Sequence, residues 1–162
     1  MGGVEKVVAL EGRDYNIKKA EFVKELLGIK GADFRLADLE KEDLSRHGRF
    51  DVVFSLGLLY HLPQPWIHLR EVRKVTDGLF LWTHCVNDDK ANVRPEGYPG
   101  WEYREYGFKD PLSGLSKYSF WPTLEGLKKM LIDCGFPRIE IVEIDSGHGD
   151  GLAVTLAAKA QA

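Results

Sequence analysis

Cysteine is scarce in this chain of 162 residues, which has only Cys85 and Cys134 and no CxxC pair. This cysteine usage argues against a disulfide framework and suits a reducing compartment. No apolar run is long enough for a signal peptide or a membrane-spanning segment, so we expect a cytoplasmic protein with no membrane partner. The net charge of −3 gives no general attraction to polyanions, and we expect no DNA partner.

Several catalytic signatures are also missing. The chain has no GxSxG motif, no Walker loop, no Cys/His nucleophile pattern and no glycine-rich nucleotide loop before its first predicted strand. We expect no metal site, because no metal-ligand spacing relates the five histidines, which are His47, His61, His68, His84 and His148. These absences argue against serine hydrolases, P-loop enzymes and zinc enzymes.

Short apolar runs alternate with helical patterns along the chain. Strands are predicted at 7–10, 32–36, 51–54, 79–83, 139–144 and 152–158, and helices at 16–27, 63–75 and 123–134. The first helix is expected to be capped by Asn16, and Trp66 and Trp82 are expected in the core. This alternation indicates an α/β fold with a doubly wound, mostly parallel Rossmann-like sheet and a C-terminal antiparallel hairpin. We expect one domain over residues 1–162.

Residues 84–122 interrupt this alternation of predicted strands and helices. The segment is polar, contains Gly and Pro, and carries seven aromatic residues, which are Tyr98, Trp101, Tyr103, Tyr106, Tyr118, Phe120 and Trp121. A segment this long is usually functional or has structure of its own. It is either a cover over the sheet edge or a substrate lid. Its basic residues could also clamp a nucleotide, but we favour an ordinary lid.

The sequence FDVVFSLGLLYH, residues 50–61, is the most informative stretch. An apolar strand ends at Ser55 and Gly57, and the carboxyl ends of parallel strands are where ligands bind in open α/β folds. Glycine lets a ligand approach the backbone, while Tyr60 and His61 provide hydrogen-bonding and proton-transferring groups beside it. We therefore expect a site at the end of this strand.

Two acidic residues follow the first two predicted strands. Glu11 ends the run VVAL and precedes Gly12, and Asp38 follows the strand at 32–36. Both carboxylates would lie at the same edge of a parallel sheet. A carboxylate in such a place can bind the vicinal hydroxyls of a ribose, and the second can accept from an adenine amino group. The pair predicts a nucleoside site.

These motifs resemble, in order and spacing, the class I S-adenosylmethionine-dependent methyltransferases. VVALEGR, FRLADLE, FDVVFSLGLLYHLPQP and LFLWTH are similar to the family's second to fifth strands, and LLYHLPQP is similar to the branch of the tRNA wobble-uridine carboxymethyl-transfer enzymes. The resemblance implies S-adenosylmethionine as cofactor. It assigns cofactor binding to Glu11, Gly12, Asp38, Leu39, Leu56 and Gly57. It places three residues at the acceptor, namely Tyr60, His61 and His84.

The chain departs from the family at its start. The family's first strand and its DxGxGxG loop have no counterpart here, so we expect an N-terminally truncated fold with weak cofactor binding and weak or no activity. The missing strand is central in the family. The strands at 7–10 and 52–54 must therefore pair directly, in a six-stranded sheet of order 3-2-4-5-7-6 in the family's numbering, or be covered by another chain. We favour a homodimer.

The resemblance implies methyl transfer to a small-molecule or RNA acceptor that the sequence does not identify. The alternative is a non-catalytic methyltransferase remnant that acts as a scaffold or subunit. The missing glycine-rich loop favours this alternative, whereas the acidic pair and the LLYH segment favour retained cofactor binding. A nucleotide-binding oxidoreductase is a weaker possibility, because it needs a glycine-rich loop too.

Overall fold

Strands and helices form two compact units, one up to Asp43 and the other from Leu44 onward. The computed structural model describes residues 4–147 and 151–161. The expectation of a single domain over 1–162 stays a prediction. None of the described helices has the length and apolar composition that crossing a membrane requires.

The first unit is a βαβ element. Strands β1 (Val7–Glu11) and β2 (Ala32–Leu36) are parallel, with their residues paired in order from the first to the last, and helix α1 (Asp14–Leu27) connects them. The helix begins after Arg13, which has extended backbone and no side-chain cap, so the predicted cap at Asn16 is wrong. It ends at Gly28, whose φ of +62° is the left-handed conformation typical of a C-terminal glycine.

Helix α1 has no buried residue. The predicted apolar positions are present, but large side chains such as Phe22 and Leu26 are 65% and 72% exposed. An amphipathic helix is normally stabilised by burying its apolar face. The first unit therefore presents apolar surface to solvent.

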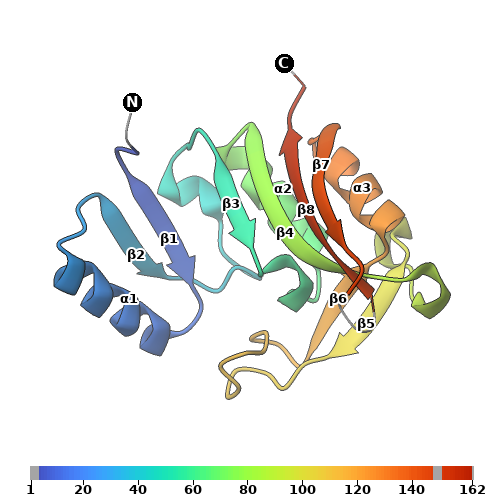
Figure 1. The fold of residues 1–162 in the computed structure, drawn as a ribbon, viewed down its shortest axis with the longest axis horizontal. Helices are drawn as coiled ribbons and strands as arrows, with labels where there is room; N and C mark the ends of the chain where they lie inside the picture. The colour runs from blue at the N-terminus through green and yellow to red at the C-terminus, as the bar shows by residue number, and fades with distance from the viewer. Residues whose placement is uncertain (1–3, 148–150, 162) are drawn as a thin grey trace. The chain divides into compact units, whose positions relative to one another are not determined.

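The second unit contains a four-stranded sheet of order β3-β4-β8-β7 (Figure 1). Its strands are β3 (Val53–Leu56), β4 (Gly78–Val86), β7 (Arg138–Asp145) and β8 (Gly151–Lys159). The pair β3–β4 is parallel, whereas β4–β8 and β7–β8 are antiparallel. This order matches the predicted order of the last four strands, and the C-terminal hairpin is confirmed. Residues 148–150 of its predicted turn, including His148, lie outside the described residues.

The direct pairing of the strands at 7–10 and 52–54 in a six-stranded sheet stays a prediction, because β1 and β3 belong to different compact units. The described strands form separate sheets, with β1 and β2 in one and β3 at the edge of another. Within the part of the chain that the structure describes, β1 is hydrogen-bonded only to β2, and β3 only to β4. Each of these two strands is therefore an edge strand of its own sheet.

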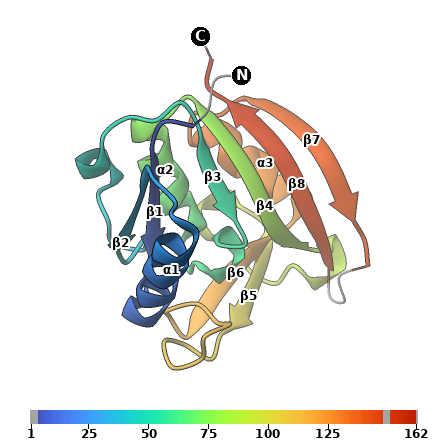
Figure 2. The same cartoon turned by 60° about the vertical axis from the view of Figure 1, so that its left-hand side comes forward.

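Two helices lie on one face of the four-stranded sheet, as two views show (Figures 1 and 2). Helix α2 (Pro65–Val75) begins with a proline, and α3 (Leu124–Asp133) begins at Thr123, whose hydroxyl accepts from the Gly126 amide at 3.1 Å. Both starts agree with the sequence signals. The helices bury the core of the unit, whose fully buried side chains include Leu69, Val72, Leu81, Leu127, Leu131, Phe136 and Leu156.

Residues 84–122 have structure of their own. Strand β4 continues to Val86, so His84 belongs to the strand and not to an irregular segment. Two short 3-10 helices follow, η3 (Asp88–Lys90) and η4 (Pro95–Gly97). The antiparallel pair β5 (Gly100–Arg104) and β6 (Tyr118–Pro122) then encloses a loop. Whether this segment acts as a lid stays a prediction.

The two tryptophans expected in the core differ. Trp66 is 6% exposed on α2 and is confirmed as a core residue. Trp82 is only half-buried, and its ring lies 5.9 and 5.2 Å, between centroids, from those of Tyr60 and His84. The prediction for Trp82 is therefore wrong, since its ring contributes to an aromatic cluster at the sheet end.

Buried His68 makes the stability of the second unit depend on pH. Its side chain lies on the inner side of α2, neither ring nitrogen has a hydrogen-bond partner among the described residues, and burial lowers the pKa of His68 from 6.5 to about 4. The folded state therefore holds His68 neutral, while the unfolded chain takes up a proton below about pH 6.5.

We expect the free energy of unfolding to be highest above pH 6.5 and to fall as the pH drops toward 4, by up to ~3 kcal/mol from this group. Urea melts at pH 7 and pH 4.5 measure the change. His68→Leu, which cannot take a proton, should reduce the difference, whereas the control His47→Gln should not. An equal difference in wild type and His68→Leu would contradict this role.

Candidate functional site

In the first unit, the two predicted acidic residues lie at the same end of the parallel pair. Glu11 is the last residue of β1, and the Ala37 amide donates to its carbonyl at 2.9 Å, which joins the ends of the two strands one residue before Asp38. Gly12 and Leu39 are the next residues along the chain. The structure thus brings the predicted ribose and adenine contacts to one edge.

Both carboxylates already accept local hydrogen bonds. Glu11 Oε1 accepts from the Arg13 amide at 2.8 Å, and Asp38 Oδ1 accepts from the Glu40 amide at 3.1 Å. Lys41 Nζ lies 2.6 Å from Asp38 Oδ2, and this surface pair contributes little to stability. The turns that follow the two strands hold the carboxyl groups at the strand ends, where a nucleoside could reach them.

In the second unit, Gly57 makes the turn that follows β3. Its φ is +71°, which favours glycine, and its amide donates to the Trp82 carbonyl at 3.1 Å. A Cβ at this position would lie 3.5 Å from the Trp82 ring and 3.9 Å from the Tyr60 hydroxyl oxygen. Leu56, which precedes it at the end of β3, is 54% exposed. The turn directs the chain into the 3-10 helix η2 (Leu59–His61).

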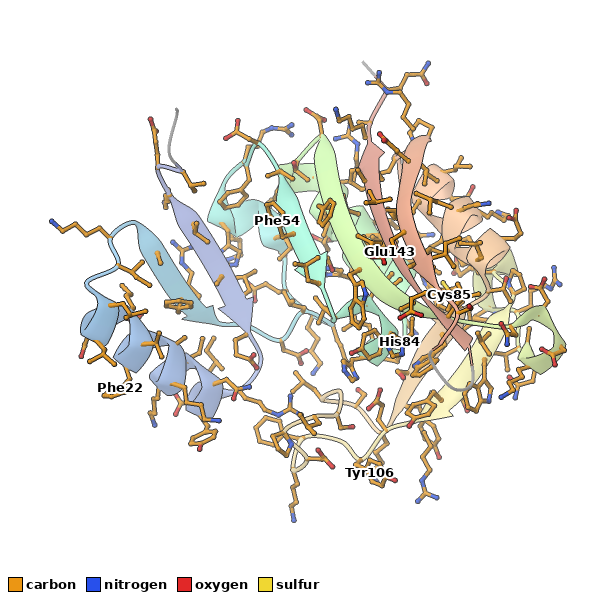
Figure 3. All side chains as sticks on the ribbon, viewed as in Figure 1. Phe22, Phe54, His84, Cys85, Tyr106 and Glu143 are labelled. Carbon is orange, nitrogen blue, oxygen red and sulfur yellow. The ribbon has the colours of Figure 1, made fainter. Side chains whose placement is uncertain are left out.

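The three residues predicted to face the acceptor are close together. The Tyr60 ring stacks on His84 with centroids 4.3 Å apart and planes 14° apart, and it contacts His61 at 4.2 Å. Trp121 of β6 meets both Tyr60 and His84 edge-on, at 5.8 and 5.0 Å. Figure 3 shows His84 near the carboxyl end of β4 and Tyr106 on the loop between β5 and β6. This aromatic cluster, completed by Trp82, Trp101 and Tyr103, lies at the end of β3 and β4.

Glu105 is a member of this site that the sequence analysis did not identify. Its side chain is 3% exposed, and Oε1 accepts from His61 Nδ1 at 3.0 Å and from Ser119 Oγ at 2.9 Å. Oε2 accepts from Ser113 Oγ at 2.5 Å and from the Gly114 amide at 3.0 Å. A buried carboxylate with four donors is well satisfied.

These contacts fix the charge of Glu105 and the tautomer of His61. Burial alone would raise the pKa of Glu105, but hydrogen bonds from His61, Ser113, Gly114 and Ser119 outweigh it and lower this pKa to about 2. An ionised carboxylate only accepts hydrogen bonds, so the proton of a neutral His61 lies on Nδ1 and Nε2 keeps its lone pair. Burial, and secondarily the charge of Glu105, raise the pKa of Tyr60, which stays a neutral phenol.

A signal for Glu105 was present in the sequence. Trp101, Tyr103 and Glu105 alternate along β5 and just beyond it, so they share one face of the strand, and cross-strand pairing places Trp121 and Ser119 opposite. A carboxylate at the third of three alternating positions, after two aromatic residues, predicts an acidic side chain on the same face of the strand as the aromatic rings. Among the described residues, no group of three or more His, Cys, Asp or Glu is placed to hold a metal ion.

Comparison with known proteins identifies the family. A model of a methyltransferase domain matches residues 1–101. The tRNA U34 carboxymethyltransferase of Serratia proteamaculans is 31% identical over 147 residues, and that of Psychromonas ingrahamii is 26% identical over the same length. Each alignment covers 88% of this chain but only 41% and 40% of these relatives. The chain thus spans about two fifths of the curated relatives it matches.

Solved structures agree with this result. The N-terminal domain of EvdMO1, crystallised with SAH bound, superposes with a TM-score of 0.89 and 32% identity over 96% of this chain and 65% of that one. The same domain was also crystallised in the presence of SAH and D-fucose. The [4+2]-cyclase SpnF, at 14% identity and a TM-score of 0.63, shares the fold alone. The fold is that of a Rossmann-like α/β transferase, and the chain belongs to the class I S-adenosylmethionine-dependent methyltransferase family.

Proposed function

We propose that this chain binds S-adenosylmethionine and transfers its methyl group to a hydroxyl of a small-molecule acceptor, with His61 as the general base. The observation that carries the proposal is the hydrogen bond between His61 Nδ1 and buried Glu105, at 3.0 Å. It leaves Nε2 to accept a proton and holds the ring in one orientation. A histidine oriented by a carboxylate is a common arrangement for general-base catalysis.

The residues present suit this cofactor. Glu11 and Asp38 offer carboxylates at the shared end of β1 and β2, where they would bind the ribose hydroxyls and the adenine amino group. When bound, S-adenosylmethionine supplies a methyl group activated by a sulfonium. In the second unit, Leu56 and Gly57 would contribute to holding the cofactor, and Tyr60 would offer a neutral phenol to the reaction. The SAH-bound neighbour supports the same cofactor.

Hydroxyl chemistry explains the need for a base. When an acceptor hydroxyl attacks, an O–C bond forms as the S–C bond breaks, and His61 Nε2 takes the hydroxyl proton. The products are the methyl ether, SAH and protonated His61, which the Glu105 carboxylate stabilises. The aromatic side chains of Tyr60, His84 and Trp121 exclude water and position the acceptor.

A small molecule is favoured over RNA. The net charge of −3 provides no general attraction to a phosphate backbone. The similar domain crystallised in the presence of D-fucose points to a sugar hydroxyl. The similarity to tRNA-modifying relatives keeps RNA as the second candidate acceptor.

Cofactor binding provides the first test. Titration calorimetry with SAH should show weak binding to wild type, and Glu11→Ala should weaken it by roughly 10- to 150-fold, because hydrogen bonds to a charged group contribute about 1.5–3 kcal/mol. Glu21→Ala removes a carboxylate that is paired with Lys24 on the same unit and should leave binding unchanged. No heat at millimolar SAH, with a folded protein, would contradict cofactor binding and favour the scaffold alternative.

A further inference from the structure

The carboxylate of Glu105 contacts two different parts of the second unit at once. Oε1 accepts from His61 and Ser119, on η2 and β6, whereas Oε2 accepts from Ser113 and Gly114 in the loop between β5 and β6. The side chain is almost completely buried. Neither oxygen can change its partners without disturbing the other side of the carboxylate. The orientation of His61 therefore depends on the same group that anchors the loop.

The loop of residues 106–117 is held by hydrogen bonds between its own residues and packs against the His61 backbone. Ser113 Oγ accepts from the amides of Tyr106 and Gly107 at 2.8 and 3.1 Å, so one hydroxyl joins the start of the loop to Glu105. The Glu105 amide donates to the Lys117 carbonyl at 2.8 Å, which fixes the loop ends. A side chain at position 114 would place Cβ only 2.5 Å from the His61 carbonyl oxygen, so the loop lies directly on the His61 backbone.

The outer part of this loop is apolar and exposed. Tyr106, Phe108 and Leu112 are 82%, 62% and 87% exposed. Three large apolar side chains on one short loop form a surface suited to contact with a ligand. The loop thus has exposed apolar side chains in its outer part, while Gly114 in its inner part packs against His61.

We propose that Glu105 is a positioning residue that couples the packing of loop 106–117 to the orientation of His61. The inference rests on the proposed function and deepens it. If loop 106–117 moves away from Glu105, the carboxylate loses its hydrogen bonds from Ser113 and Gly114. Burying a carboxylate that has lost half of its hydrogen-bond donors costs free energy. We therefore expect the Glu105 side chain to reorient. His61 then loses the fixed acceptor that keeps its proton on Nδ1.

Nitrogen-15 NMR of the histidine rings tests the coupling without any assay of transfer. In wild type, His61 should show a protonated Nδ1 and an unprotonated Nε2. Ser113→Ala, which removes the hydroxyl that donates to Glu105 Oε2, should shift the His61 ring signals toward a mixture of tautomers. Gly114→Ala, which displaces the loop by steric overlap, should do the same. Asp110→Ala also removes a loop bond, from the Leu112 amide at 2.9 Å, but keeps the four groups that donate to Glu105, and it should leave the His61 signals unchanged.

The outcomes separate the coupling from the proposed function. A proton on Nε2 in wild type, or unchanged His61 signals in both Ser113→Ala and Gly114→Ala, would overturn the coupling. If methyl transfer is measured, Ser113→Ala should lower kcat by about 10- to 100-fold with the SAH affinity unchanged, because it disturbs the orientation of the base alone. Absence of transfer together with the expected NMR shifts would overturn only the proposed function.

Discussion

His61→Ala is expected to lower the rate of methyl transfer by a factor of about 10² to 10⁴, the usual contribution of a positioned general base. The affinity for SAH should stay unchanged, because the proposed contacts to the adenosine come from Glu11 and Asp38. Single-turnover rates with labelled S-adenosylmethionine, together with calorimetry on the same variant, measure both quantities. The expected pattern is a loss of rate without a loss of binding.

The matched control is His47→Ala, which removes a histidine on the 3-10 helix η1 (Leu44–His47) that is not among the four donors to Glu105. It should keep the wild-type rate. Transfer by His61→Ala within threefold of wild type would show that the acceptor loses its proton without this base. An equal loss in both variants would indicate a general structural effect.

The second large effect concerns assembly. We propose that the chain is a homodimer, because apolar side chains such as Phe54 on β3 and Phe22 and Leu26 on α1 are more than 60% exposed. The edge strand β3 also offers unpaired backbone groups on one side. Exposed apolar surface of this kind favours association. Light scattering at micromolar concentration should give twice the chain mass of 18.3 kDa.

Phe54→Glu should convert the dimer to a monomer. Burying a phenylalanine contributes about 1.5–3 kcal/mol, and a two-fold interface contains the residue twice, so the loss exceeds a hundredfold in the dissociation constant. Leu112→Glu places the same charge at an apolar site on loop 106–117 that is even more exposed, at 87% against 64% for Phe54, and should leave the dimer intact. A wild-type mass of 18.3 kDa with a cooperative melt would contradict the homodimer.

Prolines, the N-cap threonine and glycines predicted helix starts and turns correctly, because the backbone conformation at these positions depends on the residue itself. Pro65 and Thr123 mark the starts of α2 and α3, and Gly28 and Gly57 mark positions with positive φ. The predicted cap at Asn16 is wrong, because Arg13 has an extended backbone and the helix begins two residues before the asparagine. Here the Glu11 carboxylate accepts from the Arg13 amide at 2.8 Å, and the helix starts directly after this turn.

The candidate site was predicted in part, because its members come from distant segments. Tyr60 and His61 follow an obvious strand, and the alignment with the family's fifth strand placed His84 beside them, as the 4.3 Å stacking on Tyr60 shows. Glu105 lies 44 residues after its partner His61, in a segment interpreted as a lid. Only the folding of β5 against β6 brings them together. Trp82 was assigned to the core for a related reason, since hydrophobicity does not reveal which face of β4 remains open.

The central claim is that this chain uses S-adenosylmethionine to methylate a hydroxyl with His61 as base. The most direct measurement is transfer of the labelled methyl group to a panel of sugars, nucleosides and tRNA transcripts. We predict transfer to a sugar hydroxyl. Transfer to the tRNA transcripts alone would contradict the small-molecule acceptor, and no transfer to any acceptor by a protein that binds SAH would contradict the account.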